Sequence, residues 1–205
     1  HRVLAVAISD EDPFFSMSSR YYIFLKNKST GISASHMLGL PISNLVVLSG
    51  MKIAGLVQTK SKKGKLFSPP AILKDAYITT YISGIAIFEL PSIEEDSVDI
   101  LQPTKFKTMS TRLRNLTGSG MQLFSVSNIH GFLVLLTFSG AELELTSTRP
   151  FSCMTMEDSE KSEIASIAIS PDLGVFFVLD AGLGRTVRME LDSGNCRVFE
   201  KTVSC

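Results

Sequence analysis

Residues 164–199 read IASIAISPDLGVFFVLDAGLGRTVRMELDSGNCRVF, and this stretch decides the fold class. It contains four runs of strand length, at residues 164–169, 175–179, 185–191 and 196–199. Each break between them combines glycine with aspartate. This pairing is typical of tight hairpin turns, because glycine adopts positive φ without steric cost and aspartate hydrogen-bonds its own turn. Four consecutive antiparallel strands in about 40 residues predict one blade of a β-propeller.

The same pattern recurs along the chain. Residues 3–9 repeat the apolar run of residues 164–170, and the two copies lie about 160 residues apart, which corresponds to four steps of about 40 residues. A third copy occupies residues 121–145, and hairpins are expected at residues 45–58 and 76–90. The sequence therefore predicts an all-β fold, a β-propeller of four-stranded antiparallel blades with about five blade-like units.

The predicted period also bears on domain organisation. A seven-bladed ring would need roughly 280 to 315 residues at this period, whereas the chain has 205. We therefore expect residues 1–205 to form a single propeller domain or part of a larger ring. Irregular loops are expected near residues 60–70 and 92–112. Because the strand pattern begins at the first residues, we also expect the chain to be a piece of a longer protein.

The amino-acid sequence of the C-terminal stretch resembles a WD-repeat blade. The family's usual pattern places Ser-Pro-Asp-Gly after an apolar strand and an apolar-Trp-Asp turn after an alternating strand. This sequence has Ser170-Pro171-Asp172, then Leu179-Asp180, then Met189 to Cys196, but glutamate precedes Leu191 and the chain has no tryptophan. The resemblance is therefore to a divergent WD-repeat-like propeller, and it implies a platform for protein–protein interaction.

Composition limits the classes of partner. Hydrophobic residues make up 44% of the chain and charged residues 20%, which is ordinary for a packed globular protein. Twenty basic and twenty acidic residues give zero net charge, so we expect no nucleic-acid partner. No apolar stretch approaches the ~18 to 20 residues that span a bilayer, so we expect membrane association only through other proteins. Only three cysteines are present, too few for a disulfide framework, which predicts a cytoplasmic location, with a nuclear or membrane-peripheral complex as the alternatives.

No arrangement of residues predicts catalysis, a cofactor or a metal. The three histidines, His1, His36 and His130, lie far apart, and no cysteine has a near partner in sequence. Gly182-Leu183-Gly184 lacks the third glycine and the following helix of a dinucleotide-binding turn, so we interpret it as a hairpin turn. Nothing in the sequence favours a Ser-His-Asp triad. Such a triad is recognised by its geometry and not by the order of its residues, so the sequence does not exclude one. The prediction is a protein that is not an enzyme and has no cofactor.

Two other features allow a functional interpretation. Lys60, Lys62, Lys63 and Lys65 form the one dense run of charge, which predicts either a partner-docking loop or a solvated loop. Asn27-Lys28-Ser29 and Asn115-Leu116-Thr117 fit the glycosylation acceptor pattern, which matters only in a secreted protein.

Three functions follow from this pattern. The main prediction is a non-catalytic scaffold that binds other protein subunits in a larger intracellular complex of the trafficking, tethering or coat type. Residues 77–91 and 131–145 resemble the closing blades of the tomosyn and lethal-giant-larvae proteins, which implies a SNARE regulator as an alternative. An alternative of another class is an enzyme or small-ligand binder with its site at the propeller channel. Charged residues that converge at the channel would favour this last interpretation.

Overall fold

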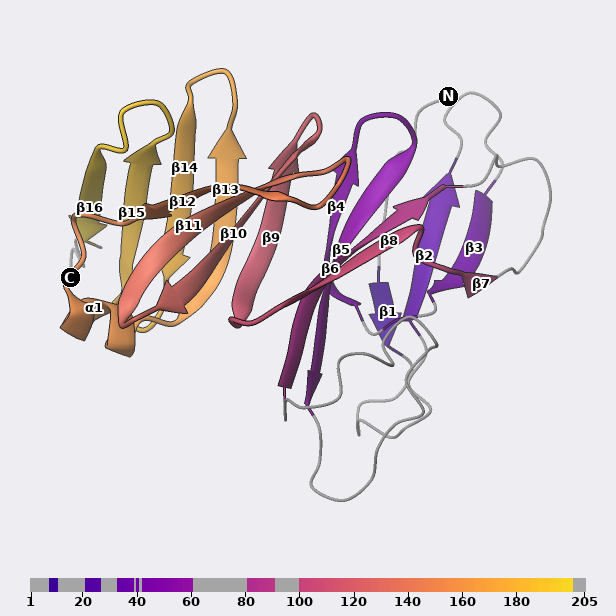
Figure 1. Ribbon diagram of the computed structural model, residues 1–205, viewed down its shortest axis with the longest axis horizontal. Coiled ribbons are helices and arrows are strands. Elements are labelled where there is room, and N and C mark those ends of the chain that lie inside the picture. Colours follow the sequence, from indigo (N-terminus) through magenta and orange to yellow (C-terminus); the bar gives the residue numbers. More distant parts are fainter. Residues whose placement is uncertain are drawn as a thin grey trace, which may run out of the picture. The chain divides into compact units, whose positions relative to one another are not determined.

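The computed structural model describes residues 8–10, 21–26, 33–38, 40, 42–60, 81–90 and 100–200. The chain divides into two compact units, residues 1–109 and 110–205, and each is described by itself. Within the described residues the fold is all-β except for one short helix, and four four-stranded sheets are present (Figure 1). Three of these sheets are purely antiparallel, which confirms the predicted fold class at this level.

The first unit contains two sheets. The strands of one are β1 (Ile8–Asp10), β2 (Tyr21–Lys26), β3 (Ser33–Leu38) and β7 (Ile100–Leu101), in that order, with β7 parallel to β3. The strands of the other are β4 (Ile42–Leu48), β5 (Lys52–Lys60), β6 (Tyr81–Glu89) and β8 (Lys105–Met109). A buried cluster that includes Leu38, Ile53 and Phe88 packs the two sheets together.

This arrangement corrects the predicted number of blade-like units. The sequence predicts separate hairpins at residues 45–58 and 76–90. The first is present as β4 and β5, but the second is wrong, because residues 81–89 form the single strand β6, which pairs with β5 in the same sheet. The pairing continues to Lys60 opposite Tyr81, across a long insertion. The described residues therefore form four sheets, and the range 92–112, expected to be irregular, contains β7 and β8.

The second unit carries the other two sheets. One has the order β12–β11–β10–β9, with strand bounds β9 (Leu113–Ser119), β10 (Gln122–Ile129), β11 (Phe132–Ser139) and β12 (Leu145–Pro150). The other has the order β13–β14–β15–β16, with strand bounds β13 (Ile164–Ser170), β14 (Val175–Asp180), β15 (Arg185–Glu190) and β16 (Cys196–Glu200). These last four strands lie where the sequence predicts them. Helix α1 (Met156–Lys161) stands in the connection from β12 to β13.

The two sheets of the second unit pack face to face. Phe124 and Val126 of β10 meet Phe176 and Val178 of β14 in one core, from which water is almost completely excluded. The first strands of the two sheets, β9 and β13, also lie side by side. A hydrogen bond from Asn115 Nδ2 to the carbonyl of Ala165 (3.1 Å) joins them. This packing fixes the β12–β13 connection, with α1, over one end of the β13–β16 sheet.

Candidate functional site

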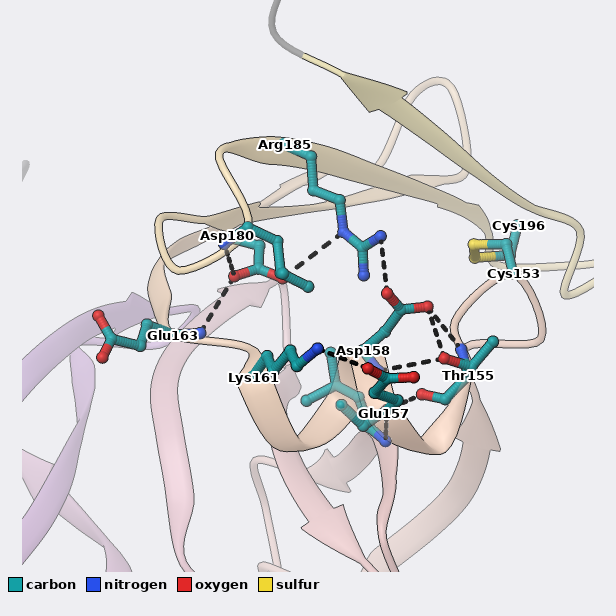
Figure 2. A network of polar contacts seen from close by, with 12 residues as sticks. Cys153, Thr155, Glu157, Asp158, Lys161, Glu163, Asp180, Arg185 and Cys196 are labelled. Atoms are coloured by element: carbon teal, nitrogen blue, oxygen red, sulfur yellow. Dashed lines mark hydrogen bonds and ion pairs between the residues drawn. A yellow bond between two sulfur atoms is a disulfide. The ribbon is translucent and has the colours of Figure 1, made fainter.

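A group of charged and polar side chains gathers at the end of the β13–β16 sheet, beneath the β12–β13 connection. We call Asp158, Asp180, Arg185, Arg114 and Ser162 the charged cluster. Figure 2 shows Asp180 and Arg185 beside α1, with Asp158 reaching Arg185 from the helix. The charges come from four elements, β9, α1, β14 and β15, so only the folded second unit brings them together.

Asp180 anchors the cluster. It ends β14 and is completely buried. Its Oδ1 accepts hydrogen bonds from the backbone N–H of Glu163 (3.0 Å) and of Leu183 (3.2 Å). Asp180 therefore holds the β14–β15 turn closed and attaches the start of β13 to it. The backbone N–H of Ala181, which donates to the Glu163 carbonyl (2.8 Å), adds a second attachment.

Gly182 allows the connection to approach this turn closely. A Cβ atom at this position would lie 2.5 Å from the Lys161 carbonyl oxygen and 2.9 Å from the Glu163 nitrogen. Both are backbone atoms, so they cannot rotate away. The sequence interpretation of Gly182-Leu183-Gly184 as a hairpin turn is correct, and the first glycine has a packing role as well.

We expect Gly182→Ala to destabilise the second unit by about 1–3 kcal/mol, the usual cost of forcing atoms into a packed site. Differential scanning calorimetry of the full chain would measure this as a lower transition temperature. Gly184→Asn is the matched control, because Gly184 has φ +62°, nothing lies within 4 Å of the place that a Cβ atom would take there, and asparagine tolerates this backbone region. Equal transition temperatures for Gly182→Ala and the unmodified chain would contradict the close approach.

Arg185 is the cation at the centre of the cluster. It begins β15 directly opposite Asp180 in the strand register. Its Nη1 lies 3.3 Å from Asp158 Oδ1, and its Nε lies 3.7 Å from Asp180 Oδ2. The Arg185 side chain is only 12% exposed, yet its Nε and Nη2 make no hydrogen bond. Asp180 Oδ2 and Ser162 Oγ, also buried, make none either. Buried polar atoms in this state are costly unless water or a ligand satisfies them.

Asp158 is positioned by a capping box at the start of α1. The backbone N–H of Thr155 (2.9 Å) and its hydroxyl (2.8 Å) both donate to Asp158 Oδ2, and the Asp158 N–H donates back to Thr155 Oγ1 (3.1 Å). These bonds favour the carboxylate, so the pKa of Asp158 is lowered, first by the Thr155 backbone and then by the Thr155 hydroxyl; the charge of Arg185 adds to this.

Thr155→Ala is expected to raise the pKa of Asp158 part of the way toward its ordinary value, because the hydroxyl is lost while the backbone donor stays. A lowered carboxyl pKa stabilises the fold above the ordinary value of about 3.9, and this stabilisation is lost as the pH falls through the lowered value. The variant should also lose about 1 kcal/mol of helix capping. NMR titration of the Asp158 carboxyl carbon measures the shift, and Thr155→Ser, which keeps the hydroxyl, should restore it. An unchanged pKa in Thr155→Ala would refute the capping account.

Arg114 brings a second cation to the cluster from β9. Its Nη1 donates to the Ser162 carbonyl (2.7 Å). Burial lowers the pKa of Arg114, as does the neighbouring positive charge of Arg112, while the charges of Asp180 and Glu163 act in the opposite direction. Two arginines therefore face two buried or half-buried aspartates, so the cluster carries nearly balanced charge.

A disulfide between Cys153 and Cys196 lies next to the cluster (Figure 2). Cys153 precedes the capping residue Thr155 by two positions, and Cys196 begins β16. The sequence predicts no cysteine pairing, because the 43 positions that separate the two hide their proximity. The packing of the two sheets brings them together, and connectivity of this kind cannot be read from sequence.

The residues singled out in the sequence lie elsewhere. Lys60 ends β5, and Lys62, Lys63 and Lys65 lie outside the described residues, as does His1. His36 is buried on β3, and His130 is exposed in the β10–β11 turn. Over the described part of the chain no three potential metal ligands come together.

The structure describes only one of the two asparagines in the predicted glycosylation motifs. Asn27 lies outside the described residues. The side-chain amide of Asn115 donates to the Ala165 carbonyl, so the nitrogen that would carry a glycan is already engaged in the fold. Among the residues that the structure describes, no helix is long and apolar enough to cross a membrane.

Comparison with known proteins indicates the fold. No family model matches the chain, and no curated protein matches it. The chain is similar to the crystal structure of a putative 6-phosphogluconolactonase from Bacteroides uniformis, with 14% sequence identity and a TM-score of 0.50. The similarity covers 96% of this chain and 53% of that chain, so this chain spans about half the length of the protein that it matches. At this level of identity the similarity shows the fold alone.

These findings correct three predictions. The WD-repeat resemblance is wrong, since no family model supports it and the similar structure has another description. The prediction of a non-catalytic scaffold in trafficking, tethering or coat complexes, with a SNARE regulator as its alternative, is also wrong, because the similar fold is described as an enzyme. The prediction that the chain is not an enzyme is overturned by the same comparison. The charged cluster draws on four separate elements, so no contiguous motif in the sequence marks it.

Proposed function

We propose that this chain is part of a β-propeller that acts as an enzyme or small-ligand binder, and that the charged cluster holds its ligand. The observation that carries this proposal is Arg185, which is almost buried between two carboxylates and has two donor nitrogens, Nε and Nη2, that make no hydrogen bond. A guanidinium group presents its donors in a rigid fork that matches pairs of oxygen atoms. The cluster lies next to β9 and β13, the first strands of the two sheets of the second unit.

The unmatched atoms define the class of ligand. Arg185 Nη2 requires an acceptor and Ser162 Oγ can take either role, whereas Arg185 Nε and Asp180 Oδ2 face each other 3.7 Å apart without a hydrogen bond. Because the charges of the two arginines and two aspartates nearly cancel, the cluster favours a neutral molecule over a strong anion. A molecule with several hydroxyl and carbonyl groups, such as a sugar or a sugar lactone, supplies both donors and acceptors. The description of the similar structure as a putative 6-phosphogluconolactonase supports a sugar lactone, while the phosphate in that name is the charged alternative that the test below includes.

The same groups suit hydrolysis of a lactone. An Arg185 N–H would hydrogen-bond the carbonyl oxygen, which gains negative charge as water attacks the carbonyl carbon. The Asp180 carboxylate would accept the proton of the attacking water, and the ring oxygen would leave as a hydroxyl after it receives a proton. The products are then one hydroxy acid for each lactone and water consumed.

Isothermal titration calorimetry with glucose, gluconolactone and 6-phosphogluconate tests the binding site. We expect one of the two neutral molecules to bind, and Arg185→Ala to weaken that binding at least tenfold. Arg185→Lys should give an intermediate loss, because lysine keeps the charge without the fork. Arg197→Ala, at an exposed arginine of the same sheet, is the matched control. Equal affinities for Arg185→Ala and the unmodified chain would remove the cluster as the site. A further measurement, of the acid released from gluconolactone, distinguishes the two functions: an enzyme releases acid, whereas a binding protein does not.

Partners and location stay predictions. We propose that other protein subunits complete the assembly and that nucleic acid takes no part, as the balanced composition indicates. The scarcity of cysteines predicts a cytoplasmic location. Disulfides are rare in the cytosol unless they are catalytic or redox-sensing. A cytoplasmic location therefore requires that the Cys153–Cys196 disulfide has a catalytic or redox-sensing role.

A further inference from the structure

The disulfide holds the part of the β12–β13 connection that contributes Asp158 to the cluster. Cys153 and Cys196 join the start of this connection to β16, with their Cα atoms 5.3 Å apart. Two residues later Thr155 begins the capping box, which orients Asp158 toward Arg185. The disulfide is therefore close in sequence to Asp158, which forms the ion pair that covers Arg185.

The rest of the connection is attached by other groups. Ser159 is buried, and its Oγ accepts a hydrogen bond from the backbone N–H of Leu133 (3.0 Å). The Ser162 carbonyl accepts from Arg114, and the Glu163 N–H donates to Asp180. Residues 159–163 are thus fixed without the disulfide.

Residues 153–158 depend on fewer attachments. Met154 is buried in the core, and Cys153 packs against the same core. Beyond the capping box, which is internal, the stretch is held by the Asp158–Arg185 ion pair, by the disulfide and by the Thr155 carbonyl, which accepts hydrogen bonds from the N–H (3.0 Å) and the hydroxyl (2.9 Å) of Ser159. Asp158 itself is 28% exposed, so its ion pair with Arg185 is partly screened by water. Loss of the disulfide would remove the cross-link that holds residues 153–158 to β16, whereas the hydrogen bonds to Leu133, Arg114 and Asp180 that hold residues 159–163 do not depend on it.

We propose that the Cys153–Cys196 disulfide is a redox-operated tether that holds Asp158 against Arg185 Nη1 and so sets how far this carboxylate shields the guanidinium. A dithiol reductant would transfer two electrons and two protons to the bond, leaving two thiols here and a disulfide on the reductant. The released stretch withdraws Asp158 from Arg185, which exposes the guanidinium and removes one negative charge from the cluster. The reduced chain then favours anionic ligands more than the oxidised chain does. The ligand effect rests on the proposed function, whereas the exposure of Arg185 does not.

Labelling with an arginine-directed dicarbonyl reagent, followed by mass spectrometry, measures the exposure without any ligand. We expect reduction of the full chain to raise the labelling rate of Arg185 by roughly threefold or more, as local opening becomes more frequent. Arg197, already exposed, should label at the same rate in both states. The double variant Cys153→Ser, Cys196→Ser should label like the reduced chain with or without reductant, which excludes an effect of Cys205.

Arg149→Ala is the matched control for a general loosening of the two sheets. Arg149 Nη1 donates to the Leu191 carbonyl and so joins β12 to the β15–β16 turn near the disulfide. This variant should keep Arg185 labelling low when oxidised and responsive to reduction. Unchanged labelling of Arg185 on reduction would overturn the tether. Loss of amide-exchange protection throughout β14 and β15 on reduction would also overturn the tether, because the disulfide would then support the whole sheet. If reduction changes the labelling of Arg185 but no sugar binds, the tether is supported and the proposed function is refuted.

Discussion

Asp180→Ala should lower the free energy of unfolding of the second unit by about 3–5 kcal/mol, the cost of removing one partner from a buried ion pair. The variant leaves Arg185 without its buried carboxylate and leaves the N–H groups of Glu163 and Leu183 without an acceptor. Asp180→Asn should cost less, because its amide oxygen still accepts from both N–H groups. The Asp192→Asn variant, at the β15–β16 turn, is the control and should change stability by no more than about 0.5 kcal/mol.

The measurement must report on the second unit alone. The chain has no tryptophan, and its four tyrosines all lie in residues 1–109, so intrinsic fluorescence reports only the first unit. Urea titration followed by hydrogen exchange in peptides from residues 164–191 gives the required value. Equal stabilities for Asp180→Ala and Asp192→Asn would show that Asp180 does not hold the turn.

Phe176→Ala should cost a similar amount, about 3–5 kcal/mol, because it removes a large side chain from a closed core. Phe176 is fully buried, and its ring lies 6.1 Å from that of Phe124 and 6.4 Å from that of Phe151, measured between centroids. It therefore joins the β13–β16 sheet to the β9–β12 sheet. Phe199→Ala on β16, where half of the side chain is exposed, is the matched control. The same exchange experiment applies, and a loss below about 1 kcal/mol would show that the two sheets do not share a core.

Much of the strand pattern could be predicted from the sequence, for a physical reason. β14 and β15 show apolar runs or alternation, and their breaks contain the glycine and aspartate that hairpins require. β12 reads LTSTRP and its side chains are largely exposed, so it has no apolar pattern to detect. β5 and β6 pair across a long insertion, which sequence spacing conceals.

The charged cluster is less visible in the sequence. Asp180 and Arg185 fit the pattern of turn residues, although an acid that ends one strand and a base that begins the next face each other across a hairpin. Thr155 and Asp158 carry the spacing of a capping box, which could have located α1. The disulfide carries no signal, because it depends on how two sheets pack.

A crystal structure of the oxidised chain soaked with gluconolactone tests the ligand-binding account most directly. The account predicts a ligand oxygen within hydrogen-bond distance of Arg185 Nε or Nη2, and a ligand hydroxyl that donates to Asp180 Oδ2. A single water molecule that bridges these atoms at saturating ligand, with the sugar absent or bound elsewhere, would contradict it.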